Sequence, residues 1–179
     1  MKKITASIFG LLAVLVTSSI INAAPYTWVD VIDFSPDVYI GWYQSYPYTH
    51  DLTDNAPVAF NPSTDTIFSY SLAVALYDDG GRYDFGEVAF IDQPGALGDG
   101  FYNFSYTNQT FGWSLAGLIQ LNTYGLLNVS VDSWTGDFYL ASSTLTACGD
   151  AAPVPEPATL LLLGSGLLGM AGFRRKFRK

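Results

Sequence analysis

Four acidic side chains around one glycine-rich turn are the residues of this 179-residue chain whose types best suit metal chemistry. Asp78 and Asp79 precede Gly80-Gly81, and Asp84 and Glu87 follow that turn. Ca²⁺ prefers carboxylate and carbonyl oxygens at about 2.3–2.6 Å, and a turn can fold several onto one ion, although this spacing does not fit an EF-hand loop. The residues form a candidate calcium site, and a solvent-exposed hairpin tip is the alternative because Asp and Gly also favour turns.

A second candidate site is a run of aromatic residues at positions 42–48. Trp42, Tyr43, Tyr46 and Tyr48 fall on both faces of an extended chain and flank Pro47. Flat aromatic rings present apolar faces that match those of pyranose sugars, so these four residues are candidate ligand-binding residues. A packed core is the alternative, because alternating aromatic residues in a small β domain often point inward. Trp28, Trp113 and Trp134 are further aromatic candidates for a sugar-stacking surface.

Catalytic chemistry has little support in the sequence. His50 is the only histidine and precedes Asp51, but the pair has no evident nucleophile beside it. One histidine also cannot build a multi-histidine metal site, so we expect a surface or strand-edge residue. Acidic pairs such as Asp84 with Glu87 allow a glycoside hydrolase as a distant alternative, although chance pairing is expected among so many acids. The sequence predicts a protein that is not an enzyme.

The charge distribution excludes one class of partner. Of the eight Lys and Arg residues, only Arg82 lies outside the two ends of the chain. It faces fourteen Asp residues and Glu87, which gives the middle of the chain a formal net charge near −14. Nucleic acid is excluded because phosphate binding needs Lys and Arg. Anionic polysaccharide would be repelled unless a divalent cation such as calcium bridges the two.

The elements that must position these residues are expected to be strands. Apolar and small or polar residues alternate with period two, and Gly, Asp, Pro and Asn clusters separate the runs. Strands at this spacing predict an all-β fold, a single β-sandwich or jelly-roll-like domain. No helix is expected between the two ends. The expected strand runs centre on Phe68–Leu76, Tyr102–Tyr106, Trp113–Leu121, Leu127–Val131 and Phe138–Leu140.

The C-terminal end carries three consecutive signals. Pro155 and Pro157, in the motif Val154-Pro155-Glu156-Pro157, restrict the backbone to an extended path until Pro157 enters a helix. The uncharged run that follows predicts a transmembrane helix at about 157–173, which is short but workable for a bilayer. An excess of cations after it should stay on the cytoplasmic side. The cations are Arg174, Arg175, Lys176, Arg178 and Lys179.

These three parts, in this order over 154–179, resemble the PEP-CTERM sorting domain, whose tail is sometimes labelled an ice-binding protein C-terminal domain. The resemblance implies that an exosortase-type membrane protease recognises Pro155, Glu156 and Pro157 as substrate features. It also implies a Gram-negative host that makes exopolysaccharide. The segment at about 47–90 loosely resembles an uncharacterised ectodomain of other PEP-CTERM proteins, without a known activity.

The N-terminal end predicts export. Lys2 and Lys3 precede an apolar core at 8–16 and small residues near Ala23, which together are typical of a signal peptide at 1–23. The remaining divisions are a β-sandwich ectodomain at 24–148 and a linker at 149–153 before the sorting signal. Cys148 is the only cysteine, so it has no partner for an intrachain disulfide.

The sequence therefore predicts an exported protein that is anchored transiently in the inner membrane and then placed on the cell surface or in the extracellular matrix. A structural or adhesive role is the first hypothesis, and a carbohydrate-binding module is the alternative. Expected partners are exosortase, the inner membrane before processing and extracellular polysaccharide.

Overall fold

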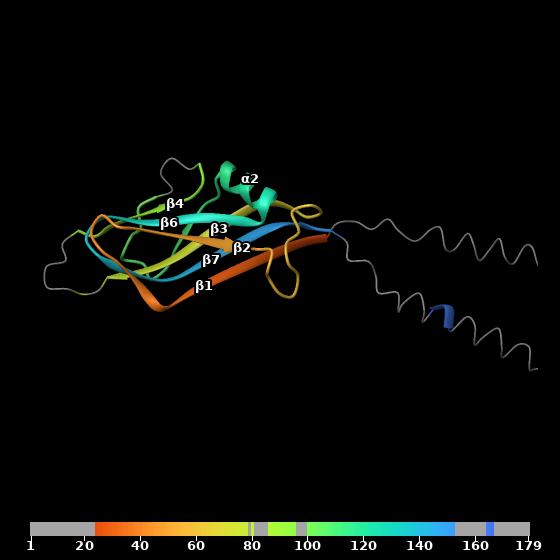
Figure 1. Ribbon diagram of the computed structural model, residues 1–179, viewed down its shortest axis with the longest axis horizontal. Helices are drawn as coiled ribbons and strands as arrows, with labels where there is room; N and C mark the ends of the chain where they lie inside the picture. Colours follow the sequence, from red (N-terminus) through yellow and green to blue (C-terminus); the bar gives the residue numbers. More distant parts are fainter. Residues whose placement is uncertain (1–23, 79, 81–85, 96–99, 153–163, 167–179) are drawn as a thin grey trace, which may run out of the picture. The chain divides into compact units, whose positions relative to one another are not determined.

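The computed structural model describes residues 24–78, 80, 86–95, 100–152 and 164–166 (Figure 1). The chain divides into two compact units, of which Ala23–Ala152 forms one. The expected signal peptide, the sorting motif Val154–Pro157, most of the expected transmembrane helix and the basic residues 174–179 lie outside the described residues. Among the residues that are described, no helix has the length and apolar character needed to cross a bilayer.

The described part of the ectodomain contains seven strands and one helix, which Figure 1 shows in place. All strand pairs are antiparallel, and the strands form two sheets with the orders β1-β7-β3-β5 and β2-β6-β4. The all-β prediction is confirmed. The elements are β1 (Ala24–Ile40), β2 (Ser45–Asp51), β3 (Thr66–Asp78), β4 (Val88–Asp92), β5 (Gln109–Phe111), α2 (Leu115–Tyr124), β6 (Leu126–Thr135) and β7 (Phe138–Ala151).

One hydrophobic core draws on both sheets. The expected alternation in β3, β6 and β7 is confirmed, because every second residue in the middle of these strands is buried. Trp28 of β1 is 1% exposed and meets the ring of Phe60 edge-on at 5.1 Å. Trp28 is therefore a core residue and does not form part of an exposed sugar-stacking surface.

Two β-bulges decide which side chains reach this core. Ile67 pairs with Gly149 and Ser69 with Cys148, so Phe68 is an extra residue and its ring is 57% exposed. In β7, Ala75 and Leu76 pair with Ser142 and Leu140, which leaves Ala141 as the extra residue. Buried positions in β7 therefore change from even to odd numbers after Leu140. The second bulge turns Ser143 into the core.

The strand predicted for Trp113–Leu121 is wrong, because Leu115–Tyr124 is the helix α2. The Ser114 hydroxyl accepts a hydrogen bond from the Gly117 N–H at 2.9 Å, and Gly125 ends the helix with a left-handed φ of 73°. These two caps outweigh an alternation that would suit a strand. The side-chain amide of Asn122 both donates to and accepts from the Ile67 backbone, so the helix covers part of the edge of β3.

The strand expected at Tyr102–Tyr106 is also wrong, since these residues form a turn. Tyr102 is 4% exposed, and its hydroxyl bonds with the N–H and the carbonyl of Leu76 and with the carbonyl of Tyr106. Burial raises the pKa of this phenol. The alternating rings thus come from one turn, which the Tyr102 hydroxyl anchors to β3 while the Tyr102 N–H donates to the Ala89 carbonyl of β4.

The prediction starts the linker of residues 149–153 too early, because β7 continues to Ala151. Gly149, Asp150 and Ala151 continue β7, where Gly149 pairs with Tyr26 on one side and Ile67 on the other. Gly149 is buried, and a methyl group there would overlap the carbonyl oxygen of Thr66. Close approach of two strands therefore requires glycine at this position.

We expect Gly149→Ala to lower the free energy of unfolding by about 1–3 kcal/mol, because backbone atoms of β3 must move to admit the methyl group. Gly112→Ala is the matched control, since no atom lies within 4 Å of the methyl position there. Urea denaturation of both variants measures the effect. Equal stability of the two would contradict the placement of Gly149 inside the sheet.

Candidate functional site

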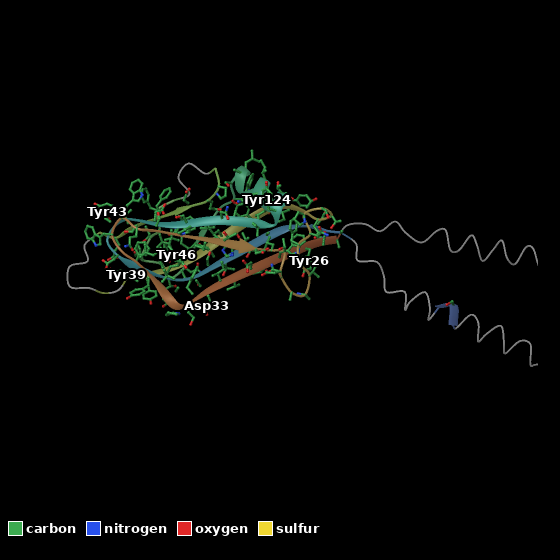
Figure 2. The ribbon with its side chains drawn as sticks, in the orientation of Figure 1. Tyr26, Asp33, Tyr39, Tyr43, Tyr46 and Tyr124 are labelled. Atoms are coloured by element: carbon green, nitrogen blue, oxygen red, sulfur yellow. The ribbon has the colours of Figure 1, made fainter. Side chains whose placement is uncertain are left out.

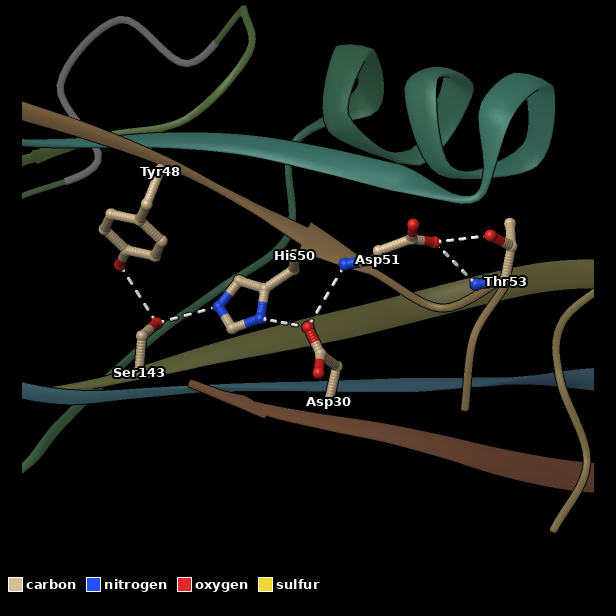
Figure 3. Close-up of polar contacts among 6 residues, drawn as sticks. All are labelled: Asp30, Tyr48, His50, Asp51, Thr53 and Ser143. Carbon is tan, nitrogen blue, oxygen red and sulfur yellow. Dashed lines mark hydrogen bonds and ion pairs between the residues drawn. The ribbon is translucent and has the colours of Figure 1, made fainter. Parts of the chain in front are cut away.

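A chain of hydrogen bonds around His50 joins the two sheets through the core (Figure 3). His50 is 0% exposed, so the prediction of a surface residue is wrong, although β2, on which it lies, is an edge strand of its sheet. Its Nδ1 lies 2.8 Å from Asp30 Oδ2 on β1, and its Nε2 lies 2.8 Å from Ser143 Oγ on β7. The Tyr48 hydroxyl donates to the same Ser143 oxygen at 2.9 Å. One buried ring therefore ties β2 to both neighbouring strands of the other sheet.

The proton positions follow from the partners. Asp30 Oδ2 also accepts the Asp51 N–H at 3.1 Å, so this carboxylate acts as an acceptor and His50 Nδ1 carries a proton. Nε2 of a neutral ring then accepts the Ser143 O–H, and Ser143 accepts the Tyr48 O–H. Burial lowers the pKa of His50 below 6.5, against the opposing effect of Asp30. The ring is thus held neutral with both nitrogens paired.

Burial also changes the chemistry of Tyr48. Desolvation raises the pKa of this phenol, against the smaller opposing effect of its hydrogen bond to Ser143. The hydroxyl therefore keeps its proton at physiological pH and serves as a donor. Its ring packs edge-on against Phe34 at 5.4 Å and against His50 at 5.6 Å.

Serine, histidine and aspartate in this order match the roles of a hydrolytic triad, with nucleophile, base and orienting group. Ser143 and His50 are each 0% exposed, however, and the Tyr48 hydroxyl already occupies the serine oxygen. A nucleophile needs a reacting carbonyl about 3 Å away, and the core packed around Ser143 occupies that position. The geometry supports a structural role for the chain of bonds.

Sequence reasoning missed two members of this cluster. Asp30 and Ser143 lie 20 and 93 residues from His50, and the pairing of β1 with β7 brings them together. The bulge at Ala141 turns Ser143 inward, and strict alternation gives no sign of it. The even-numbered aromatic residues that precede His50, Tyr46 and Tyr48, are the only local signal that His50 faces the core.

The four aromatic residues predicted to bind ligand separate into two pairs. Trp42 and Tyr43 are 55% and 77% exposed in the turn between β1 and β2, with ring centres 6.2 Å apart. Tyr43 has a positive φ of 56°. Tyr46 and Tyr48 instead point inward and pack on Phe34. The structure therefore does not place the four rings on one surface; Figure 2 labels Tyr43 of the turn and Tyr46 of β2.

The predicted calcium ligands are only partly described. Asp79 and Asp84 lie outside the described residues. Asp78 ends β3, and its Oδ1 accepts the Gly80 N–H at 2.9 Å, which is the ordinary role of Asp in a turn. Within the part of the chain that is described, no three His, Cys, Asp or Glu side chains are grouped closely enough to hold a metal ion.

Three tyrosines form a row on the outer face of the first sheet. Tyr139 pairs with Tyr39 on β1 and with Tyr77 on β3, and the rings of Tyr77 and Tyr139 stack at 5.3 Å. Tyr77 donates to Asp37 at 2.5 Å and Tyr39 donates to Asp137 at 2.6 Å. The hydrogen bond to Asp37 is the main cause that raises the pKa of Tyr77 to about 12.

The comparisons add one assignment, an export and sorting signal. Residues 153–176 match the family described as the PEP-CTERM protein-sorting motif, which confirms the prediction from Val154–Pro157. This motif marks an exported protein that is processed at the membrane by exosortase, a membrane protein, on its way to the cell surface or the extracellular space. The family of the ectodomain is not identified by this match.

Comparison with curated proteins finds no match. Among solved structures, the crystal structure of FLHE is 12% identical, covering 72% of this chain and 100% of that one, with a TM-score of 0.40. Dimeric latent PorU from Porphyromonas gingivalis is 9% identical, covering 74% of this chain and 13% of that one, with a TM-score of 0.41. Similarities of this size identify neither a fold family nor an activity.

We expect protonation of His50 to destabilise the folded protein as the pH falls. The His50 ring has a pKa of 6.5 in the unfolded chain, and burial lowers this pKa in the folded protein. The contribution of His50 to stability is therefore fully present above pH 6.5. It declines as the pH falls below 6.5 toward the lowered pKa of the folded state. The slope can reach about 1.4 kcal/mol per pH unit. Thermal unfolding between pH 7.5 and 5.5 measures it. His50→Gln is the control, because its amide also offers a donor group and an acceptor but does not titrate. An equal slope in this variant would show that another group causes the pH dependence.

We also expect the Tyr48 and Ser143 hydroxyls to be energetically coupled. Ser143→Ala leaves the Tyr48 donor and the His50 acceptor without partners and should cost about 2–3 kcal/mol, whereas Tyr48→Phe should cost about 1 kcal/mol. The double variant should lose less than the sum, because Tyr48→Phe removes one of the two groups that Ser143→Ala orphans. Strict additivity in urea denaturation would show that the chain of bonds does not act as a unit.

Proposed function

We propose that this chain is a structural or adhesive protein of the cell surface or extracellular matrix, sorted by exosortase in a Gram-negative bacterium that makes exopolysaccharide. The sorting motif at 153–176 is the observation that carries the proposal. A motif of this kind is an address, so the function of the exported part must be argued from the ectodomain itself.

The proposed route uses both ends of the chain. The signal peptide at 1–23 directs export, and the apolar segment at about 157–173 anchors the chain in the inner membrane with residues 174–179 on the cytoplasmic side. Exosortase then acts at Pro155, Glu156 and Pro157 and releases or transfers a two-sheet sandwich. Because the β-unit ends at Ala152, the motif at 153–176 follows it directly in the sequence.

A non-catalytic role agrees with the interior of the ectodomain. The one Ser–His–Asp arrangement is buried and has its serine oxygen occupied by Tyr48. Hydrogen bonds across the core give a rigid body of the kind that an extracellular scaffold needs. Carbohydrate binding is the second candidate function, and exposed aromatic rings on the outer sheet faces favour it.

The test of the sorting proposal is intact mass and cell fractionation in the producing bacterium. We expect the wild-type chain to lose residues 1–23 and the C-terminal helix, and the triple variant Pro155→Ala/Glu156→Ala/Pro157→Ala to keep the helix and remain in the membrane fraction. Gly112→Ala, in the ectodomain and outside the motif at 153–176, is the control and should be processed. Normal processing of the triple variant, or an uncleaved chain in the cytosol, would refute this route.

A further inference from the structure

The outer face of the β2-β6-β4 sheet carries polar and aromatic side chains along its central strand, β6. On β6, residues 128, 130, 132 and 134 point outward, whereas Leu127, Val129 and Val131 are buried. This outward row spans seven residues, 128–134, which is about 20 Å of strand. It begins with polar side chains at Asn128 and ends with Trp134, so one strand joins two kinds of surface.

The polar end of this row lies in a groove of about 530 Å³. That volume is within the ~300–1,000 Å³ usual for small-molecule sites. Thr49, Asn128 and Ser130 line the groove, as does Asp92, which lies at the end of β4 beside Ser130. Thr49 donates to Asn128 Oδ1 at 2.9 Å, which fixes the amide. The lining thus offers hydroxyl, amide and carboxylate groups to an incoming ligand.

The same row carries a second carboxylate, that of Asp132. Asp132 Oδ1 accepts hydrogen bonds from the hydroxyls of Ser45 on β2 and Ser130 on β6. Phe90 pairs with Asp132 from the other side. The carboxylate is therefore positioned by two neutral hydroxyl donors, which are groups of the same kind that a sugar presents.

The far end of the row is an aromatic platform. Trp134 stacks on Phe90 with ring centres 5.9 Å apart and planes at 23°, and Phe101 meets both rings edge-on. Trp134 is 53% exposed and Phe101 is 54% exposed. Supporting contacts hold the indole in one orientation while much of it faces solvent. A fixed, exposed indole beside hydrogen-bonding groups suits the apolar face of a pyranose.

Charge selects among the possible sugars. The segment between the two ends has a formal net charge near −14; Asp132 lies within the row, and Asp92 of β4 lies beside Ser130. Like charges facing each other in an interface disfavour binding, so an anionic polysaccharide is a poor partner for this face. An uncharged glycan brings hydroxyl donors for the carboxylates and no repulsion.

We propose that the outer face of the β2-β6-β4 sheet, from Asn128 to Trp134, binds an uncharged polysaccharide chain. Trp134 supplies the stacking surface, and Asp92, Ser130 and Asp132 bind hydroxyl groups of the sugar. The biological setting of this inference rests on the proposed surface role, but the binding is a property of the ectodomain and does not require processing.

The experiment is native electrophoresis of the full-length chain, in a detergent without a sugar head group, through gels that contain β-glucan, galactomannan, dextran or alginate. We expect at least one of the three neutral polysaccharides to retard the wild-type protein and alginate to leave it unretarded. Trp134→Ala should weaken binding about tenfold or more, the equivalent of one decade in Kd, and Asp92→Ala should weaken it as well.

Tyr77→Ala is the matched control, because Tyr77 is another exposed ring stacked on a neighbour, but on the other sheet. Its retardation should equal that of the wild type. Thermal unfolding checks each variant, and Asp92→Ala decides the case if Trp134→Ala is unfolded, since Asp92 is an exposed strand end. The proposal is overturned if no neutral polysaccharide retards the protein, if Asp92→Ala and Trp134→Ala bind as the wild type does, or if Tyr77→Ala alone abolishes binding. None of these results would alter the processing test.

Discussion

The need to pair both nitrogens of a buried imidazole is the constraint around which the two sheets are arranged. An unpaired polar group in a core costs about 1–3 kcal/mol, so His50 must meet a donor and an acceptor that face each other across the ring. Asp30 and Ser143 satisfy this only when β1 and β7 run side by side opposite β2. The hydrogen bonds therefore specify how one sheet lies over the other, in addition to contributing stability.

That arrangement depends on an irregularity in β7. Without the extra residue Ala141, Ser143 would point to solvent and the residues after it would exchange faces. The bulge therefore turns both Ser143 and the later apolar residues of β7 toward the core. This explains why Leu145 and Ala147, which follow it, are fully buried. Phe68 shows the opposite result, because the bulge in β3 turns an apolar ring outward.

The sequence predicts those features that depend on local pattern. Alternation identifies β3, β6 and the start of β7, and the C-terminal motif identifies the sorting signal. It fails for α2, where the caps at Ser114 and Gly125 decide the structure and the alternation misleads. Alternation also fails to predict the environment of His50, because long-range strand pairing brings both of its partners beside it. A single-residue shift in register carries no signature in composition or spacing.

The excess of acidic residues has a chemical consequence that also bears on the proposed glycan face. The segment between the ends contains no lysine and one arginine, so its carboxylates depend largely on neutral donors. Asp37 and Asp137 accept tyrosine hydroxyls, Asp132 accepts serine hydroxyls, and Asp51 accepts the Thr53 hydroxyl. Hydrogen bonds of this type depend less on ionic strength than ion pairs do, which suits an extracellular protein. A polysaccharide offers more hydroxyl donors of the same kind, so binding one would extend the pattern that already organises the surface.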